Sequence, residues 1–307
     1  MIRQIQPPPP VKPGDRVGIA ALSGPVDPAA LDTGLGELRR IGFEPVTATN
    51  LKSREGLFAG SDQERLEGFH RLVADESLSA VFFARGGHGL LRLLPRIDWD
   101  LLARRPRAYI GYSDVTPFLN QVVMRLGWVA FHGPMVAVDF ARGLQAVEEV
   151  SLLGALVGEP QVIPSEGGSG EVVEGTILGG CLSLLTAVLE TKYAVDLEDA
   201  VLFWEDVDEP VYRLDRMLTH LDLSGRLSAI KAMVVGCVEP ADEHEAGETL
   251  RQRLDLLALE KGLSLAVGIP SGHCCPNLTL PIGAIARVDP PRGEVTFSLG
   301  KGVGAWA

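Results

Sequence analysis

The residue best placed for nucleophilic chemistry is Ser113, because of the segment in which it stands. Residues 107–119 read RAYIGYSDVTPFL, which predicts a strand ending at Gly111, then a tight turn and a helix. A serine on that turn lies at a helix N-terminus, where free N–H groups and the helix dipole favour developing negative charge. This is the order of a nucleophile elbow, although Val115 stands where G-x-S-x-G needs its second glycine. A plain Ser-Asp helix cap is the alternative.

A nucleophilic serine needs a base, and three of the six histidines stand on predicted turns. His88 follows two glycines, His132 precedes a Gly-Pro pair, and His273 follows a glycine just after a predicted strand. The others lie in predicted helices or in an acidic loop, where solvated roles are expected: His70, His220 and His244. The sequence therefore leaves His273, His132 and His88 as competing bases.

The candidate acid is Glu205, which follows an apolar strand in the segment AVLFWEDVDE over residues 200–209. A carboxylate at a strand end can orient an imidazole and stabilise its charged form. Three further acids follow it: Asp206, Asp208 and Glu209. A polar loop whose acids are solvated, or pair with Arg213 and Arg216, is therefore the alternative.

Two glycines after the third predicted strand, Gly86 and Gly87, can bring bare N–H groups to the same edge of a sheet. With the N–H of Asp114, one of them would form an oxyanion hole. An ordinary turn is the simpler reading. A dinucleotide loop does not fit, because RGGHG lacks the G-x-G-x-x-G spacing and does not follow the first strand.

These side chains need a scaffold, and the first half of the chain alternates strand and helix patterns. Strands are predicted at 16–21, 43–48, 78–83 and 107–111, and helices at 28–41, 61–74, 90–94 and 116–126. Such alternation predicts a parallel sheet covered on both faces, with the site beyond the carboxyl ends of its strands. The turns around Ser23, Gly86 and Ser113 fall at those ends.

The second half begins after a segment rich in Gly, Ser, Pro and Glu, residues 154–174, which predicts an interdomain linker with an edge strand. Strands are then expected at 176–180, 200–204, 232–238 and 265–268, and helices at 182–189, 212–223 and 249–261. Residues 239–247 read as an acidic loop, and residues 284–299 alternate around Pro-Pro-Arg-Gly, which is typical of a hairpin.

Composition excludes several classes of protein. The 307 residues are 46% hydrophobic and 22% charged, which is typical of a globular chain. A net charge of −12 argues against a nucleic-acid binder. No apolar run reaches the roughly 20 residues that span a membrane. The N-terminal sequence MIRQIQPPPP lacks the apolar core of a signal peptide, so we expect a cytoplasmic protein.

The four cysteines lie at positions 181, 237, 274 and 275 and contain no CxxC pair. This number in a long chain predicts no disulfide framework. His273-Cys274-Cys275 lacks the paired ligand spacing of structural zinc sites. We therefore expect neither a metal nor a cofactor.

Taken together, these segments resemble the LD-carboxypeptidases of serine peptidase family S66, which include murein tetrapeptide carboxypeptidases and microcin C immunity proteins. Each matching piece is weak alone, but their joint order and spacing is specific over nearly the whole chain. The pieces are Ser23-Gly24-Pro25, Ala84-Arg85-Gly86-Gly87-His88-Gly89, Gly111-Tyr112-Ser113-Asp114, His132-Gly133-Pro134, LGGCLSLL over 178–185, Trp204-Glu205-Asp206, Tyr212-Arg213-Leu214-Asp215-Arg216, Gly272-His273 and Leu280-Pro281-Ile282-Gly283.

The resemblance implies a Ser-Glu-His triad, which corresponds here to Ser113, Glu205 and His273. It also implies an α/β fold with an N-terminal flavodoxin-like parallel-sheet domain and a C-terminal β-rich α/β domain. We place the first at residues 1–153, the linker at 154–174 and the second at 175–307, with the site between the domains.

The activity implied is removal of the terminal D-alanine from cytoplasmic murein tetrapeptides in peptidoglycan recycling, by a homodimer. Another amide substrate, such as a microcin C-like peptidyl nucleotide, is the alternative. A carboxypeptidase must bind a free terminal carboxylate, and Arg85 is the cation best placed by sequence. Backbone N–H groups are the alternative anchor.

Overall fold

The computed structural model describes residues 5–240 and 246–299. One sheet has six strands in the order β12-β5-β4-β3-β1-β2, and all of them except β12 come from the first half of the chain. Strands β1 to β5 run parallel, in the arrangement of flavodoxin-like folds, and β12 pairs antiparallel with β5. The strands are β1 Arg16–Ala20, β2 Glu44–Thr47, β3 Leu78–Phe83, β4 Ala108–Gly111, β5 Ala130–His132 and β12 Leu280–Ile282.

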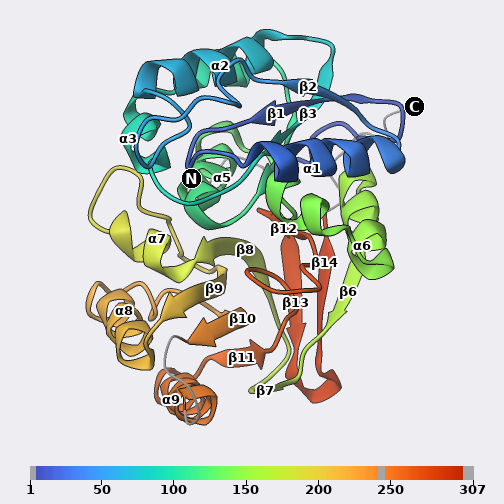
Figure 1. The fold of residues 1–307 in the computed structure, drawn as a ribbon. Coiled ribbons are helices and arrows are strands. Elements are labelled where there is room, and N and C mark those ends of the chain that lie inside the picture. Colours follow the sequence, from blue (N-terminus) through green and yellow to red (C-terminus); the bar gives the residue numbers. More distant parts are fainter. Residues whose placement is uncertain (1–4, 241–245, 300–307) are drawn as a thin grey trace.

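Helices cover both faces of this sheet, as the alternating pattern predicted. Helices α1 and α2 lie on opposite sides (Figure 1), as right-handed crossovers require when the chain moves outward to β2 and then back to β3. Asp27 caps α1, and Ser61 with Glu64 forms a capping box on α2. The helices are α1 Pro28–Arg40, α2 Asp62–Ala74, α3 Leu90–Leu93, α4 Trp99–Ala103, α5 Thr116–Gln121 and α6 Ala146–Val157.

Short 3-10 and π-helical turns complete this half: η1 Leu94–Arg96, η2 Ser113–Val115, η3 Val122–Leu126 and η4 Val136–Phe140. The helix expected over 116–126 therefore changes from α to π at residue 122. Phe118 fixes α5 in the core, since its ring lies 5.2 to 5.7 Å from the rings of Phe69, Phe83, Trp99 and Tyr109. This anchor holds the turn that carries Ser113.

The second half forms a mixed eight-stranded sheet in the order β6-β14-β13-β8-β9-β10-β11-β7. Strands β8 to β11 are parallel, and the other pairs are antiparallel. Helices α7 to α9 lie beside β8 to β11 (Figure 1). The strands are β6 Gln161–Pro164, β7 Gly167–Ser169, β8 Val173–Cys181, β9 Val201–Glu209, β10 Ala232–Pro240, β11 Ser264–Val267, β13 Ile285–Asp289 and β14 Glu294–Ser298, and the helices are α7 Leu182–Ala187, α8 Val211–Leu223, α9 Ala246–Lys261 and η5 Pro290–Arg292.

The segment 154–174 differs from the expected linker with a single edge strand. It contains the end of α6, all of β6 and β7, and the start of β8, and β6 and β7 close opposite edges of the second sheet. Its glycines serve packing here, because a Cβ on Gly168 would lie 2.2 Å from the carbonyl oxygen of Leu265. The three-part division of the chain remains a prediction.

The two sheets are joined by more than one crossing of the chain. Strand β12 comes from the predicted second domain but pairs in the first sheet, where Leu280 lies opposite His132. The predicted acidic loop lies largely outside the described residues, as does His244. Within the described part, no helix is both long and apolar enough to cross a membrane.

Candidate active site

Ser113 lies at the carboxyl end of β4, on the turn that opens η2 and continues into α5. Its φ of +63° is in the left-handed region, which a non-glycine residue rarely occupies. Such a conformation persists only where surrounding structure enforces it, and it is typical of functional turns. The sequence prediction of a strand–turn–helix at this serine is confirmed.

Gly86 packs directly against Ser113. A Cβ at position 86 would lie 2.8 Å from both Cβ and Oγ of Ser113, and 3.4 Å from the backbone N of Asp114. Only glycine fits without displacing the serine. The buried carboxylate of Asp114 accepts a hydrogen bond from the N–H of Leu90 at 2.9 Å, which ties the glycine loop to the serine turn.

Glu205 and His273 form the closest acid–base pair of the site. Nδ1 of His273 lies 2.7 Å from Oε2 of Glu205, and the backbone N–H of His273 donates to the same oxygen at 3.3 Å. Glu205 is fully buried in β9, whereas the His273 side chain is 21% exposed. Gly272, with φ of +120°, makes this approach possible, because a Cβ there would lie 2.6 Å from Oε2 of Glu205.

The environment favours the charged form of both partners. Burial alone would raise the pKa of Glu205, but the hydrogen bond with His273 and the electrostatic interactions with both His273 and His132 outweigh burial and lower the pKa to about 2. Burial alone would lower the pKa of His273, but its hydrogen bond and Coulomb attraction to Glu205 raise the pKa above the usual 6.5. The imidazole of His273 therefore has an increased affinity for a proton, as a general base requires.

The structure separates the three competing histidines. His88 is exposed, and its ring lies 5.7 Å from that of Phe58. His132 is buried and reaches Glu205 from the other side, with Nε2 3.6 Å from Oε1. Only His273 combines a short contact to the acid with partial exposure, so the geometry favours it as the base.

The contact between serine and base is indirect in this structure. Within the described residues, no hydrogen bond joins Ser113 to His273. Tyr112, the neighbour of Ser113, packs its ring edge-on against that of His273 with centroids 4.9 Å apart. Catalytic hydrogen bonds are often long before substrate binds, so the lack of a Ser113–His273 hydrogen bond is compatible with a working triad.

Comparison with known proteins identifies the family. Residues 17–133 match the LD-carboxypeptidase N-terminal domain, and residues 174–288 match the LD-carboxypeptidase C-terminal domain. The chain belongs to the LD-carboxypeptidase family. It is therefore a hydrolase of the carboxypeptidase class.

Similar proteins support this membership. The chain is 34% identical to a probable murein peptide carboxypeptidase of Bacillus subtilis, over 95% of this chain and 94% of that one. It is 30% identical to the solved muramoyltetrapeptide carboxypeptidase of Oxalobacter formigenes, with a TM-score of 0.83 over 92% of this chain and 97% of that one. The microcin C7 self immunity protein, at 22% identity, shares the fold with a TM-score of 0.85 over 95% of this chain and 98% of that one.

The acids that follow Glu205 in this member of the LD-carboxypeptidase family have structural contacts. Asp206 is buried and accepts hydrogen bonds from the N–H groups of Ser183 at 2.7 Å and Val207 at 2.9 Å, so it fixes the start of α7. Glu209 pairs with Arg213 at 3.4 Å, as the polar-loop alternative anticipated for these acids. Neither contact involves Glu205.

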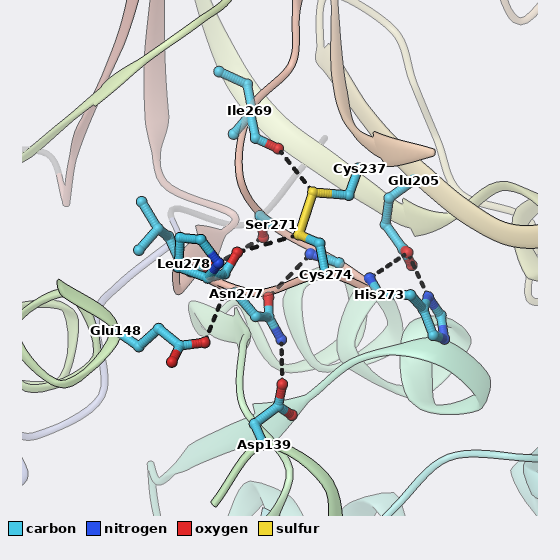
Figure 2. The surroundings of a disulfide bond; sticks show 12 residues. Asp139, Glu148, Glu205, Cys237, Ile269, Ser271, His273, Cys274, Asn277 and Leu278 are labelled. Carbon is cyan, nitrogen blue, oxygen red and sulfur yellow. Dashed lines mark hydrogen bonds and ion pairs between the residues drawn. A yellow bond between two sulfur atoms is a disulfide. The ribbon is translucent and has the colours of Figure 1, made fainter. Parts of the chain in front are cut away.

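A buried network that the sequence did not reveal holds the loop carrying His273. The side-chain oxygen of Asn277 accepts from the N–H of Gly272 at 3.0 Å, and the N–H of Asn277 donates to Glu148 at 2.7 Å. The Asn277 amide also donates to Asp139 at 3.3 Å. Figure 2 shows both carboxylates below the loop, so the network ties the loop to η4 and α6.

A disulfide lies on the other side of the same loop, joining Cys237 to Cys274 with Cα atoms 6.1 Å apart (Figure 2). The expectation that the cysteines form no framework missed this pair. The two are 37 residues apart, and they meet because Cys237 in β10 lies beside the loop, where its N–H donates to the carbonyl oxygen of Ser271 at 3.0 Å. Cys181 and Cys275 are free.

Arg85 has no carboxylate partner within ion-pair distance among the described residues. Its guanidinium donates to the carbonyl oxygens of Pro25 at 3.2 Å and Gly86 at 3.3 Å. A Cβ on Gly24 would lie 3.4 Å from its Nε, so the cation borders the glycine loop. In the described part of the chain, no cluster of three or more His, Cys, Asp or Glu is suited to hold a metal ion.

Proposed function

We propose that this enzyme is a serine LD-carboxypeptidase that removes the terminal D-alanine of murein tetrapeptides. The observation that carries the proposal is the buried Glu205, 2.7 Å from His273, whose ring packs against Tyr112 next to Ser113 in its left-handed turn. The printed names of the Bacillus and Oxalobacter relatives support a murein peptide substrate.

In the proposed reaction, Oγ of Ser113 attacks the carbonyl that precedes D-alanine while Nε2 of His273 takes the hydroxyl proton. The tetrahedral intermediate collapses when His273 returns that proton to the leaving amine of D-alanine. Water then attacks the acyl-enzyme with His273 again as base, which releases the shortened peptide and restores the serine. Glu205 keeps the hydrogen of His273 on Nδ1 and stabilises the imidazolium.

The oxyanion would be held by backbone N–H groups of Asp114 and of Gly86 or Gly87. Support comes from the close packing of Gly86 on Ser113 and on the backbone N of Asp114. Donors fixed by the fold stabilise developing charge without reorganisation, which is the usual origin of a large part of catalysis.

Arg85 would bind the terminal carboxylate of the substrate. It borders the oxyanion glycines and, among the described residues, has carbonyl partners but no acid. The alternative remains that backbone N–H groups alone hold this carboxylate. We further propose a cytoplasmic homodimer acting in peptidoglycan recycling, on the strength of the family resemblance.

Mass spectrometry of products from purified muropeptides tests the proposal. Loss of one D-alanine from tetrapeptides, abolished in Ser113→Ala, is the expected result. Cleavage of an aminoacyl sulfamoyl nucleotide in preference to tetrapeptides would instead favour the microcin-type activity, whose support is the fold shared with the microcin C7 self immunity protein.

A further inference from the structure

A second histidine contacts Glu205 on the side opposite His273. His132, the last residue of β5, has a side chain that is 1% exposed, and its Nε2 lies 3.6 Å from Oε1 of Glu205. These two buried atoms have no other hydrogen-bond partner within the described residues. Because an unpaired buried polar atom is costly, each atom is the natural partner of the other.

The other ring nitrogen of His132 faces Ser271. The distance from Nδ1 to Oγ of Ser271 is 3.3 Å, and the same hydroxyl donates to the carbonyl oxygen of Leu278 at 2.8 Å. A hydroxyl has one hydrogen to donate. When that hydrogen points to Leu278, Oγ can only accept, so Nδ1 of His132 must carry a hydrogen.

The contact with Glu205 sets the hydrogen on Nε2. A carboxylate accepts and never donates, so a bare Nε2 would place two lone pairs face to face in a buried site. With a hydrogen on Nε2 the contact is attractive. Nε2 carries this hydrogen in both arrangements that the contacts allow. Either both ring nitrogens are protonated, or only Nε2 is and the hydroxyl of Ser271 donates to Nδ1.

We propose that His132 is a positioning residue of the carboxypeptidase reaction, which directs Nε2–H at Oε1 of Glu205 and so holds the carboxylate from the side opposite His273. The proposal rests on the proposed roles of Glu205 and His273. The 3.6 Å separation exceeds a hydrogen bond, but contacts between catalytic groups are often long in the absence of substrate and shorten in the substrate complex. Aromatic rings fix the imidazole, with Phe203 at 5.0 Å and Tyr112 at 5.7 Å.

The arrangement has a consequence for pH dependence. Because the carboxylate of Glu205 also interacts with Nε2–H of His132, it stabilises the imidazolium of His273 less than it would if His273 were its only partner. Loss of His132 leaves Glu205 to His273 alone, which raises the pKa of the base and moves the acid limb of kcat/KM to higher pH. Four other ionisable side chains interact electrostatically with Glu205 or His273: Tyr112, Asp139, Cys181 and Asp206.

Two substitutions separate the two contacts of the ring. Glutamine places an amide N–H near the position of Nε2, and asparagine places one near Nδ1. We expect His132→Gln to retain kcat within about tenfold, and His132→Asn to lose about 10- to 100-fold in tetrapeptide cleavage, the range for a lost hydrogen bond to a charged group. Only His132→Asn should shift the acid limb upward.

Equal losses in both variants with an unmoved acid limb, or a larger loss in His132→Gln, would overturn the proposal. Should either variant fail to fold, ¹⁵N NMR of the wild-type histidine rings decides directly, because Nε2 of His132 must carry a hydrogen and a bare Nε2 would refute the assignment. This spectrum needs no substrate. If wild type released no D-alanine, the proposed function would fail while the ring assignment could still be read.

Discussion

Replacing Glu205 with glutamine removes one buried negative charge and keeps the size of the side chain. In the wild type, Oε2 accepts from Nδ1 of His273 at 2.7 Å and from its backbone N–H at 3.3 Å. An amide can keep one of these contacts but cannot stabilise the imidazolium by charge. We expect the fold to persist, because the residue remains buried at the same volume.

The magnitude follows from the electrostatics of the pair. The pKa of Glu205 is lowered from 4.5 to about 2 by His273 and His132 together, against the effect of burial, which corresponds to about 3 kcal/mol of net stabilisation of the carboxylate. If this stabilisation were lost in the transition state, the rate would fall about 100-fold. Loss of an orienting acid from a triad costs about 10⁴-fold. We therefore expect kcat to fall by about 10²- to 10⁴-fold.

The assay is release of D-alanine from a purified murein tetrapeptide, with unfolding midpoints measured in parallel. Asp208→Asn is the matched control, because it also removes one acid from β9, is exposed, and has φ of +59°, which asparagine tolerates. It should change kcat little. A silent Glu205→Gln beside a crippling Asp208→Asn would refute the assignment of the acid.

Further tests address the anchor, pH, redox state and metals. Arg85→Ala should lower kcat/KM for tetrapeptides about 10- to 100-fold, and amidating the terminal D-alanine should cost wild type more than this variant; equal sensitivity would remove Arg85 from the site. Because Glu205 raises the pKa of His273, kcat/KM should fall as the pH drops through a value above 6.5, and a half-maximal rate well below 6.5 would contradict this base. Reducing the disulfide with dithiothreitol should lower kcat about tenfold by loosening the loop of His273, in wild type and in Cys275→Ser but not in Cys237→Ser. Chelators should leave the rate unchanged, whereas loss with EDTA and recovery with zinc would overturn the serine mechanism.

Local pattern was sufficient for most of the first sheet. The strand predicted at 78–83 is β3 at the same residues, and the helix predicted at 28–41 ends one residue earlier. Both are long, strongly patterned segments with clear ends. The turn at Ser113 could be predicted because a strand, a short polar turn and a Pro-containing helix follow in order.

Features that depend on distant residues were not readable in this way. The disulfide between Cys237 and Cys274 joins residues 37 positions apart, and the hydrogen bond from the N–H of Asn277 to Glu148 joins residues 129 positions apart. Strand β9 runs through Glu205 to residue 209, although its acidic end has the composition of a loop. It does so because β10 pairs with it over that stretch. Tertiary pairing outweighed local preference here.

The central claim is that Ser113 is the nucleophile of an LD-carboxypeptidase, and a quenched single turnover tests it most directly. Enzyme in excess over tetrapeptide is stopped in acid, digested and analysed by mass spectrometry. We predict that the peptide containing Ser113 gains the mass of the substrate acyl group without D-alanine, and that one free D-alanine appears for each adduct. Undiminished D-alanine release by Ser113→Ala, or an adduct on another residue, would contradict the account.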